Sequence, residues 1–181
     1  MHQVSVVVLA LIASVVLVSP AVAQGHRAGA GINIMSPLGD MDDGVGGYIS
    51  YMFDISDMLA TYVGLSHVTG DYDLVVDGVQ YKGGYSGTSA EAAFLVQWHM
   101  DSFSPYAGIG GGWTSLSFDD MNVGDKLSLF YTFGMLLPIS ETLSLETSAR
   151  LQYLRPRSYR PQTETVDMDG WLVRLGVTWD F

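Results

Sequence analysis

The chain has 181 residues, of which 48% are hydrophobic and only 15% are charged, and its formal net charge is −11. This composition is too apolar for a disordered chain, low in charge for a soluble domain, and too acidic to favour a nucleic-acid partner. The lack of cysteine excludes disulfide scaffolds and thiol catalysis. The 21 glycines and the 12% of aromatic residues favour β-structure over helical bundles.

The first segment is an almost unbroken apolar run over residues 4–18, and the small-x-small sequence Ala21-Val22-Ala23 follows it. This pattern predicts a secretory signal peptide, although no Lys or Arg precedes the run. A retained anchor helix is the alternative, but about 15 residues are short for a hydrocarbon core about 30 Å thick. We therefore expect residues 1–23 to be a cleavable signal peptide and residues 24–181 to form one exported domain.

Apolar and polar residues alternate with period two through most of the exported part, which indicates β-strands. Eight segments follow this pattern: 26–35, 45–53, 58–68, 88–98, 105–116, 126–138, 143–154 and 170–181. Each has the nine to eleven residues, or slightly more, that a tilted membrane strand needs.

The connections between these segments differ in length and polarity. Long polar connections (36–44, 69–87, 117–125 and 155–169) alternate with short ones (54–57, 99–104 and 139–142). Such alternation, together with an even strand count, is typical of an outer-membrane barrel whose termini lie in the periplasm. The sequence therefore predicts an all-β fold, an eight-stranded antiparallel up-and-down transmembrane β-barrel in the outer membrane.

The two faces of the predicted strands differ in charge. The large apolar face carries no charge, as a lipid-facing surface requires, because an Arg or Lys at the bilayer midplane costs about 2–4 kcal/mol. The opposite face carries glycines, hydroxyls and a few charges, and side chains fill the lumen of an eight-stranded barrel. Buried charges are tolerated only when paired. We therefore expect a charge network that plugs the lumen and in which both glutamates pair with arginines: Arg27, Glu91, Glu146, Arg150 and Arg174.

Two stretches carry a resemblance to a known group of proteins. Residues 104–113 read Ser-Pro-Tyr-Ala-Gly-Ile-Gly-Gly-Gly-Trp, and the chain ends in the alternating strand 171–181. With these stretches and its first segment, the chain resembles the small bacterial outer-membrane β-barrels, which include the OmpA transmembrane domain and the OmpX and OmpW families. The resemblance implies that Trp179 and Phe181 form the signal recognised by the outer-membrane assembly machinery. It bears on fold and location and hardly on activity.

Catalytic motifs do not emerge from the sequence. The lipid A deacylases among these barrels are expected to carry a His-x-Ser pair, but none of His26, His67 and His99 is followed by serine at that spacing. Ser66 directly precedes His67, which places the two side chains on opposite faces of a strand. We therefore expect no enzymatic activity and no cofactor.

The acidic residues concentrate in the long connections: Asp40, Asp42, Asp43, Asp71, Asp73, Asp77, Asp119, Asp120, Asp125, Glu164, Asp167 and Asp169. Their carboxylates could bridge divalent cations to lipopolysaccharide phosphates, and the simpler alternative is that they are solvated. The one basic cluster is Arg155, Arg157 and Arg160. It could bind a phosphate of lipopolysaccharide, or it could only make its loop soluble.

Three functions remain open at this point. The first is a structural, adhesion or envelope-interaction role exerted through the extracellular loops. The second is OmpW-like passage of small hydrophobic molecules, for which the apolar lumen lining would include Tyr48, Met52, Leu95 and Phe130. The third, a soluble lipocalin-like binder, is disfavoured by the alternation of loop lengths. A paired charge layer would favour the first function, and an apolar upper cavity would favour the second.

Overall fold

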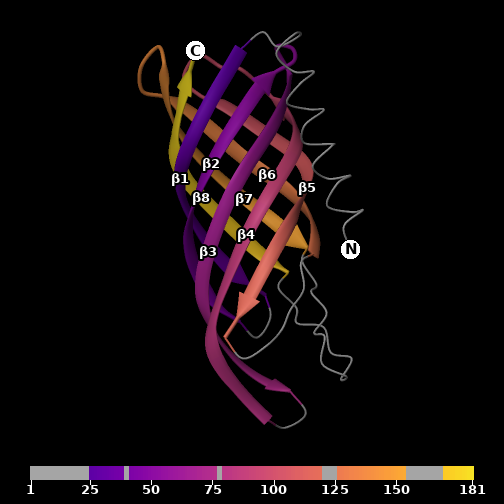
Figure 1. Cartoon of the computed structure of the whole chain (residues 1–181). Coiled ribbons are helices and arrows are strands. Elements are labelled where there is room, and N and C mark those ends of the chain that lie inside the picture. Colours follow the sequence, from indigo (N-terminus) through magenta and orange to yellow (C-terminus); the bar gives the residue numbers. More distant parts are fainter. Residues whose placement is uncertain (1–24, 39–40, 77–78, 120–125, 154–168) are drawn as a thin grey trace.

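The computed structural model describes residues 25–38, 41–76, 79–119, 126–153 and 169–181, which form one closed antiparallel β-barrel (Figure 1). Its strands are β1 (Gly25–Pro37), β2 (Met41–Asp54), β3 (Leu59–Val76), β4 (Val79–Gln97), β5 (Ser104–Phe118), β6 (Lys126–Pro138), β7 (Leu143–Tyr153) and β8 (Gly170–Asp180). Each strand pairs with the next, and β8 pairs with β1 to close the barrel. The predicted fold class, an eight-stranded up-and-down barrel, is confirmed.

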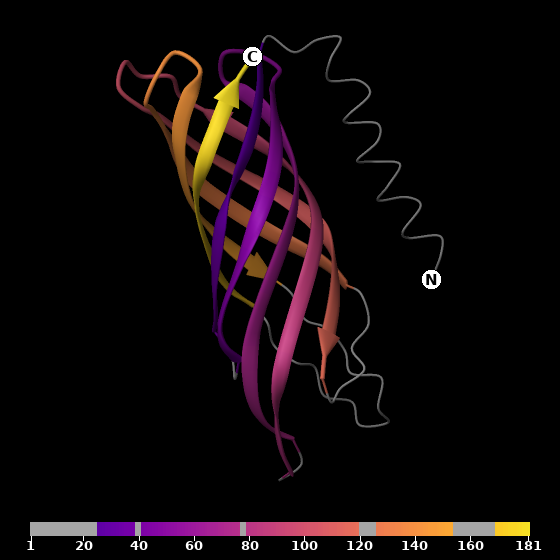
Figure 2. The same cartoon turned by 60° about the vertical axis from the view of Figure 1, so that its left-hand side comes forward.

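The two ends of the barrel differ. The start of β1 and the end of β8 lie at one end, together with the turns β2–β3, β4–β5 and β6–β7, and we call this the terminal end (Figures 1 and 2). The other ends of the eight strands lie together at the opposite end, which we call the distal end. No helix of the described ranges is long and apolar enough to cross a membrane. The expected signal peptide, residues 1–23, lies outside the described residues.

Two predicted loops at the distal end were wrong. We expected loops over 36–44 and 69–87, but β1 and β2 extend into the first range, and β3 and β4 pair as far as Val76 and Val79. The β3–β4 hairpin consequently projects beyond the other strands (Figure 1). A polar composition does not exclude strands here, because a ribbon outside the barrel wall can expose both faces to water.

An ion pair spans this projecting hairpin. Lys82 Nζ lies 2.7 Å from Asp73 Oδ2, and the two residues are directly opposite each other on β4 and β3. Hydrogen bonds from Lys82 and from Gln80 lower the pKa of the exposed Asp73 carboxyl. Cross-strand pairs of opposite charge stabilise such ribbons modestly.

Alternate residues of each strand face outward and into the lumen. The exposed outward side chains of the barrel wall are mainly large and apolar, as predicted: Ile32, Ile34, Ile49, Leu65, Phe94, Ile109, Leu127, Leu129, Phe133, Val173 and Leu175. We call this surface the apolar belt. The described Glu and Arg side chains of the mid-strand regions face the lumen instead, where they are buried.

Gly46 and Gly47 offer a matched test of the barrel wall. A Cβ at Gly46 would overlap the carbonyl group of His67 on β3, whereas the atom nearest to a Cβ at Gly47 is 3.5 Å away. Gly46→Ala should lower the free energy of unfolding by about 1–3 kcal/mol, because β2 has to move away from β3. Gly47→Ala should change it by less than about 0.5 kcal/mol. Urea unfolding in detergent micelles measures both, and equal effects would contradict this account.

Candidate functional site

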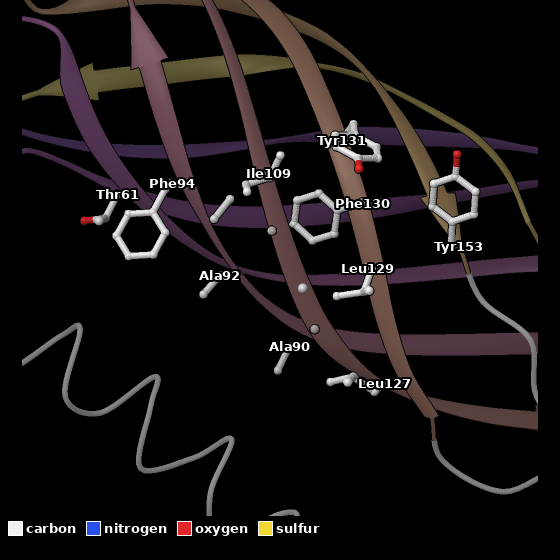
Figure 3. A pocket seen from close by; sticks show the side chains of 14 residues that line it. Thr61, Ala90, Ala92, Phe94, Ile109, Leu127, Leu129, Phe130, Tyr131 and Tyr153 are labelled. Atoms are coloured by element: carbon white, nitrogen blue, oxygen red, sulfur yellow. The ribbon is translucent and has the colours of Figure 1, made fainter.

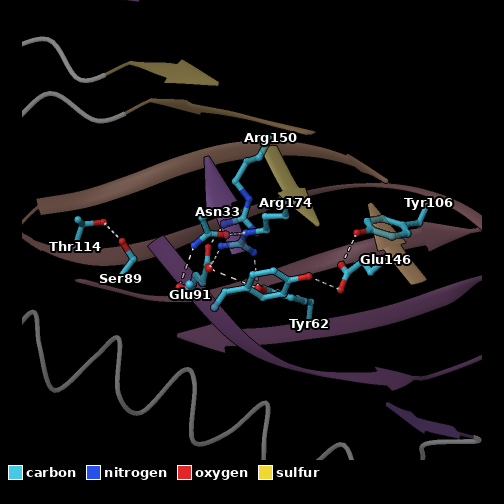
Figure 4. A network of polar contacts seen from close by, with 11 residues as sticks. Asn33, Tyr62, Ser89, Glu91, Tyr106, Thr114, Glu146, Arg150 and Arg174 are labelled. Atoms are coloured by element: carbon cyan, nitrogen blue, oxygen red, sulfur yellow. Dashed lines mark hydrogen bonds and ion pairs between the residues drawn. The ribbon is translucent and has the colours of Figure 1, made fainter. Parts of the chain in front are cut away.

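The centre of the lumen holds three charged side chains from different strands: Glu91 of β4, Arg150 of β7 and Arg174 of β8 (Figure 4). The two carboxylate oxygens of Glu91 form ion pairs with Arg150 and with Arg174. All three residues are at most 3% exposed. We call them the central charge cluster. One carboxylate thus connects its strand to two others across the lumen.

Neutral groups surround the two arginines. Arg174 Nε donates to Asn33 Oδ1 at 3.1 Å, and Arg174 Nη1 donates to the Tyr62 hydroxyl at 2.6 Å. The Arg150 guanidinium lies 3.7 Å from the centre of the Phe130 ring. Cation–π contacts of this kind contribute about 0.5–2 kcal/mol. These groups replace water around the two buried cations.

Glu146 has different partners from those we predicted. We expected an arginine, but the hydroxyls of Tyr106 and Tyr48 donate to its carboxylate oxygens at 2.7 and 3.1 Å. Among the described residues, no Lys or Arg forms an ion pair with it. The reason is geometric, because side chains four residues apart on one strand are separated by about 13 Å. Arg150 therefore reaches across the lumen to Glu91.

Arg27 lies apart from the central charge cluster, at the terminal end of the barrel. It forms an ion pair with Asp54, and its Nε lies 3.6 Å from Asp180 Oδ1. Gln97 accepts a hydrogen bond from Arg27 at 2.9 Å and donates one to Asp54 at 2.8 Å. We call these four residues the terminal clasp. It ties β1, β2, β4 and β8 together at the terminal end.

Two clusters of buried apolar side chains lie in other parts of the lumen. The cluster at the distal end, here the distal cluster, contains Met35, Met41, Val68, Tyr72, Tyr85, Leu116, Phe118 and Leu172. The cluster nearer the terminal end contains Met52, Ala60, Tyr62, Ala93, Leu95, Tyr106, Phe130 and Leu136. A cavity of about 20 Å³ lies beside the distal cluster and is partly lined by Ser66, Ser89 and Thr114. It has room for about one water molecule.

Sequence reasoning missed several of these lumen residues. It named Tyr48, Met52, Leu95 and Phe130 as apolar lining, and all four are buried inside the barrel. It did not predict the distal cluster. It also did not predict that the hydroxyls of Tyr48, Tyr62 and Tyr106 donate hydrogen bonds to the carboxylates of Glu146 and Glu91. Strand alternation carried the signal in part, because Tyr62 lies two residues from Gly64 on the small, polar face of its strand.

The last two predicted aromatic residues lie on the outside of the terminal end. Trp179 is 44% exposed and Phe181 is 72% exposed. The Phe181 N–H donates to the His26 carbonyl at 3.0 Å, and its ring centre lies 6.2 Å from that of Tyr51. Both aromatic side chains are therefore accessible at the seam where β8 meets β1.

The predicted lipopolysaccharide contacts, Arg155, Arg157 and Arg160, lie outside the described residues. Five of the predicted loop acids are instead on strands or directly after one: Asp42, Asp43, Asp71, Asp73 and Asp119. Over the described ranges, no group of three or more His, Asp or Glu residues is arranged to hold a metal ion.

The predicted opposite placement of Ser66 and His67 agrees with the structure. Ser66 is buried in the lumen, whereas His67 is exposed on the outside, with Nδ1 2.9 Å from Thr88 Oγ1. The two side chains cannot form a catalytic pair.

Known proteins resemble this chain in fold, and none of the comparisons shows a family for it. No protein-family model matches the chain, and no curated protein matches it. Among solved structures, OprG, an outer-membrane protein of Pseudomonas aeruginosa, is 13% identical with a TM-score of 0.74, over 88% of this chain and 96% of OprG. The chain has the fold of the small outer-membrane β-barrels.

Two further solved structures share this fold. Neisserial surface protein A is 17% identical with a TM-score of 0.59, over 86% of this chain and 94% of that protein. Ail, the attachment invasion locus protein of Yersinia pestis, is 15% identical with a TM-score of 0.55, over 87% and 97% of the two chains. At such low identity the match establishes architecture only.

Glu91→Gln and Glu146→Gln each replace a carboxylate by an amide of nearly the same shape, in two different surroundings. Glu91→Gln should lower the free energy of unfolding by about 3–5 kcal/mol, because two buried guanidinium groups lose their counter-charge. Glu146→Gln should lower it by about 1 kcal/mol, because an amide oxygen still accepts a hydrogen bond from a tyrosine. Urea titration of the folded barrel in micelles measures both. A loss for Glu146→Gln as large as that for Glu91→Gln would refute this difference.

Proposed function

We propose that the protein is an integral outer-membrane barrel with a closed lumen, which acts through the surface at its distal end. The observation that carries this proposal is the distribution of charge across the barrel wall. The apolar belt faces outward, while Glu91, Glu146, Arg150 and Arg174 are buried inside. A soluble barrel needs the reverse, with a polar exterior and an apolar interior.

The orientation follows from the connections. Outer-membrane barrels have short turns and both termini on the periplasmic side. The terminal end of this barrel has those features, so it faces the periplasm in our proposal. The distal end, with the projecting β3–β4 hairpin, then faces the cell exterior (Figure 2).

The polar layers and apolar clusters support a closed lumen. The central charge cluster crosses the middle of the barrel, and the terminal clasp occupies its periplasmic mouth. The described cavity beside the distal cluster holds about one water molecule. A path for ions would require these ion pairs to separate, which leaves unpaired charges in a narrow space.

Contact with the cell envelope or with another surface is the role that this architecture serves. Neisserial surface protein A and the attachment invasion protein Ail share the barrel, which supports a role at the cell surface. Lipopolysaccharide is the partner that we propose at the distal rim. Arg155, Arg157 and Arg160 would bind its phosphates. The aspartates near the distal end, such as Asp42, Asp43 and Asp71, would bind divalent cations that also bind these phosphates.

The distal cluster favours a second function, passage of small hydrophobic molecules. Its apolar side chains line the distal part of the lumen. A hydrophobic compound entering there would have to displace these side chains, because the present cavity measures about 20 Å³. Such a compound should bind the folded barrel saturably, which equilibrium binding in micelles measures. A closed barrel with a purely surface role gives no such saturable binding.

Membrane location is tested by fractionation and gel migration. We expect the exported protein in the outer-membrane fraction, and we expect its migration on a gel to change on boiling, because closed barrels resist unfolding by detergent. Recovery in the soluble periplasmic fraction would refute the membrane location.

Planar-bilayer recording tests the closed lumen. We expect the purified wild-type protein to form no stable, large open channels, because paired charges and packed apolar side chains occupy the lumen. A large porin that leaves an aqueous channel, recorded in the same bilayer, serves as the positive control. Long-lived openings of the wild-type protein would show that the lumen conducts.

A further inference from the structure

The outer wall of the barrel carries a groove of about 620 Å³ over β4, β5 and β6 (Figure 3). Its ridge is a row of large side chains at paired positions, in which Phe94 is opposite Ile109 and Ile109 is opposite Tyr131. The adjacent row begins with Ala92 and Gly111, which are also opposite each other and form the floor. We call this feature the β4–β6 groove.

Three consecutive glycines of β5, Gly110 to Gly112, line the groove, and the structure gives different reasons for the absence of a side chain at these positions. Gly110 and Gly112 face the lumen, where a Cβ would collide with the carbonyl oxygens of Ala92 and Ala90 respectively. Gly111 faces outward, and a Cβ there would lie 3.1 Å from the Ser128 oxygen, which is tight but does not require the backbone to move far. Lumen packing therefore accounts for two of the three glycines, and the third keeps the groove open.

Thr61 lies at one end of the groove, beside Phe94 (Figure 3). The residue is 4% exposed, and its hydroxyl has no hydrogen-bond partner in the described part of the chain. A buried hydroxyl without a partner is costly and calls for a ligand or a water molecule. The oxygen points away from Phe94 in Figure 3, so it would have to turn about the Cα–Cβ bond to face a ligand in the groove.

The location of Thr61 points to the kind of ligand. It is two residues from the start of β3 at Leu59, and therefore close to the periplasmic interface in the orientation proposed above. The ester carbonyls of phospholipids lie at that interface, and their acyl chains extend from it into the bilayer. The groove has the same order, with the hydroxyl of Thr61 at one end followed by the apolar side chains of Phe94 and Ile109, while the other two hydroxyls of the lining, those of Tyr131 and Tyr153, lie away from Thr61 (Figure 3).

We propose that the β4–β6 groove binds one acyl chain of a phospholipid from the periplasmic leaflet, whose ester carbonyl accepts a hydrogen bond from Thr61. This inference rests on the outer-membrane location proposed above. The groove is continuous with the apolar belt, where acyl chains are the surrounding medium. A second copy of the barrel fits less well. A stable interface buries about 800 Å² on each partner, whereas the groove is a narrow depression that crosses only three strands.

Lipid retention in native mass spectrometry tests the proposal. The full-length mature barrel is refolded into nanodiscs of dioleoyl phosphatidylethanolamine and dioleoyl phosphatidylglycerol, and the lipids that remain bound after release are counted. Ala92→Leu fills the floor of the groove. Ala30→Leu is the matched control, because Ala30 faces outward on β1, away from the groove. We expect one phospholipid on the wild type and on Ala30→Leu, and at least tenfold less on Ala92→Leu.

Thr61→Val removes the hydroxyl and keeps the shape of the side chain. The loss of one hydrogen bond should lower phospholipid retention about threefold to tenfold. A purely structural threonine gives a different result, because the removal of a hydroxyl without a partner leaves retention unchanged.

The other outcomes are equally decisive. Equal retention by wild type, Ala92→Leu and Ala30→Leu overturns the groove proposal, provided that all three migrate as folded barrels. A wild-type dimer that becomes monomeric in Ala92→Leu, without bound lipid in either protein, also overturns it and assigns the groove to self-association. Failure of every protein, wild type included, to enter a bilayer contradicts the proposed membrane location instead.

Discussion

The interior of this barrel depends on Glu91, because this one carboxylate is the counter-charge for arginines on two other strands. Eight strands enclose a space that side chains must fill, and bulk water cannot solvate charges there. Each guanidinium therefore needs a fixed partner within reach. The pairing of Glu91 with Arg150 and Arg174 meets this need and links β4 to β7 and β8 across the lumen.

The other lumen layers follow from the same restriction. Glu146 lies too far along its strand to share Arg150, so the tyrosine hydroxyls of Tyr48 and Tyr106 bind its charge. Arg27 is close to the terminal end and takes its partners from the ends of neighbouring strands. Apolar side chains occupy the levels between and beyond these polar groups. The result is a barrel filled along its described length, with polar and apolar layers in alternation.

The sequence predicted which residues face the lumen much better than which of them meet. Alternation with period two places Glu91, Glu146 and Arg174 on the inner face, because neighbouring side chains on a strand point in opposite directions. It does not determine their height in the barrel, which depends on the stagger between strands. That stagger separates Arg27 and Glu146 from the central charge cluster. The sequence did not predict the β4–β6 groove for the same reason. Its ridge and floor are formed by residues of three strands, and the stagger between these strands decides which residues lie side by side.

The β3–β4 hairpin has a consequence for how the molecule can change over time. Beyond Tyr72 and Gly84, its two strands pair only with each other among the described residues. Its exposed positions, such as Gln80 and Lys82, take no part in lumen packing and lie outside the apolar belt. Substitutions there change the surface of the distal end without disturbing the barrel wall. The sequence of this hairpin can therefore change over time while the barrel wall stays constant.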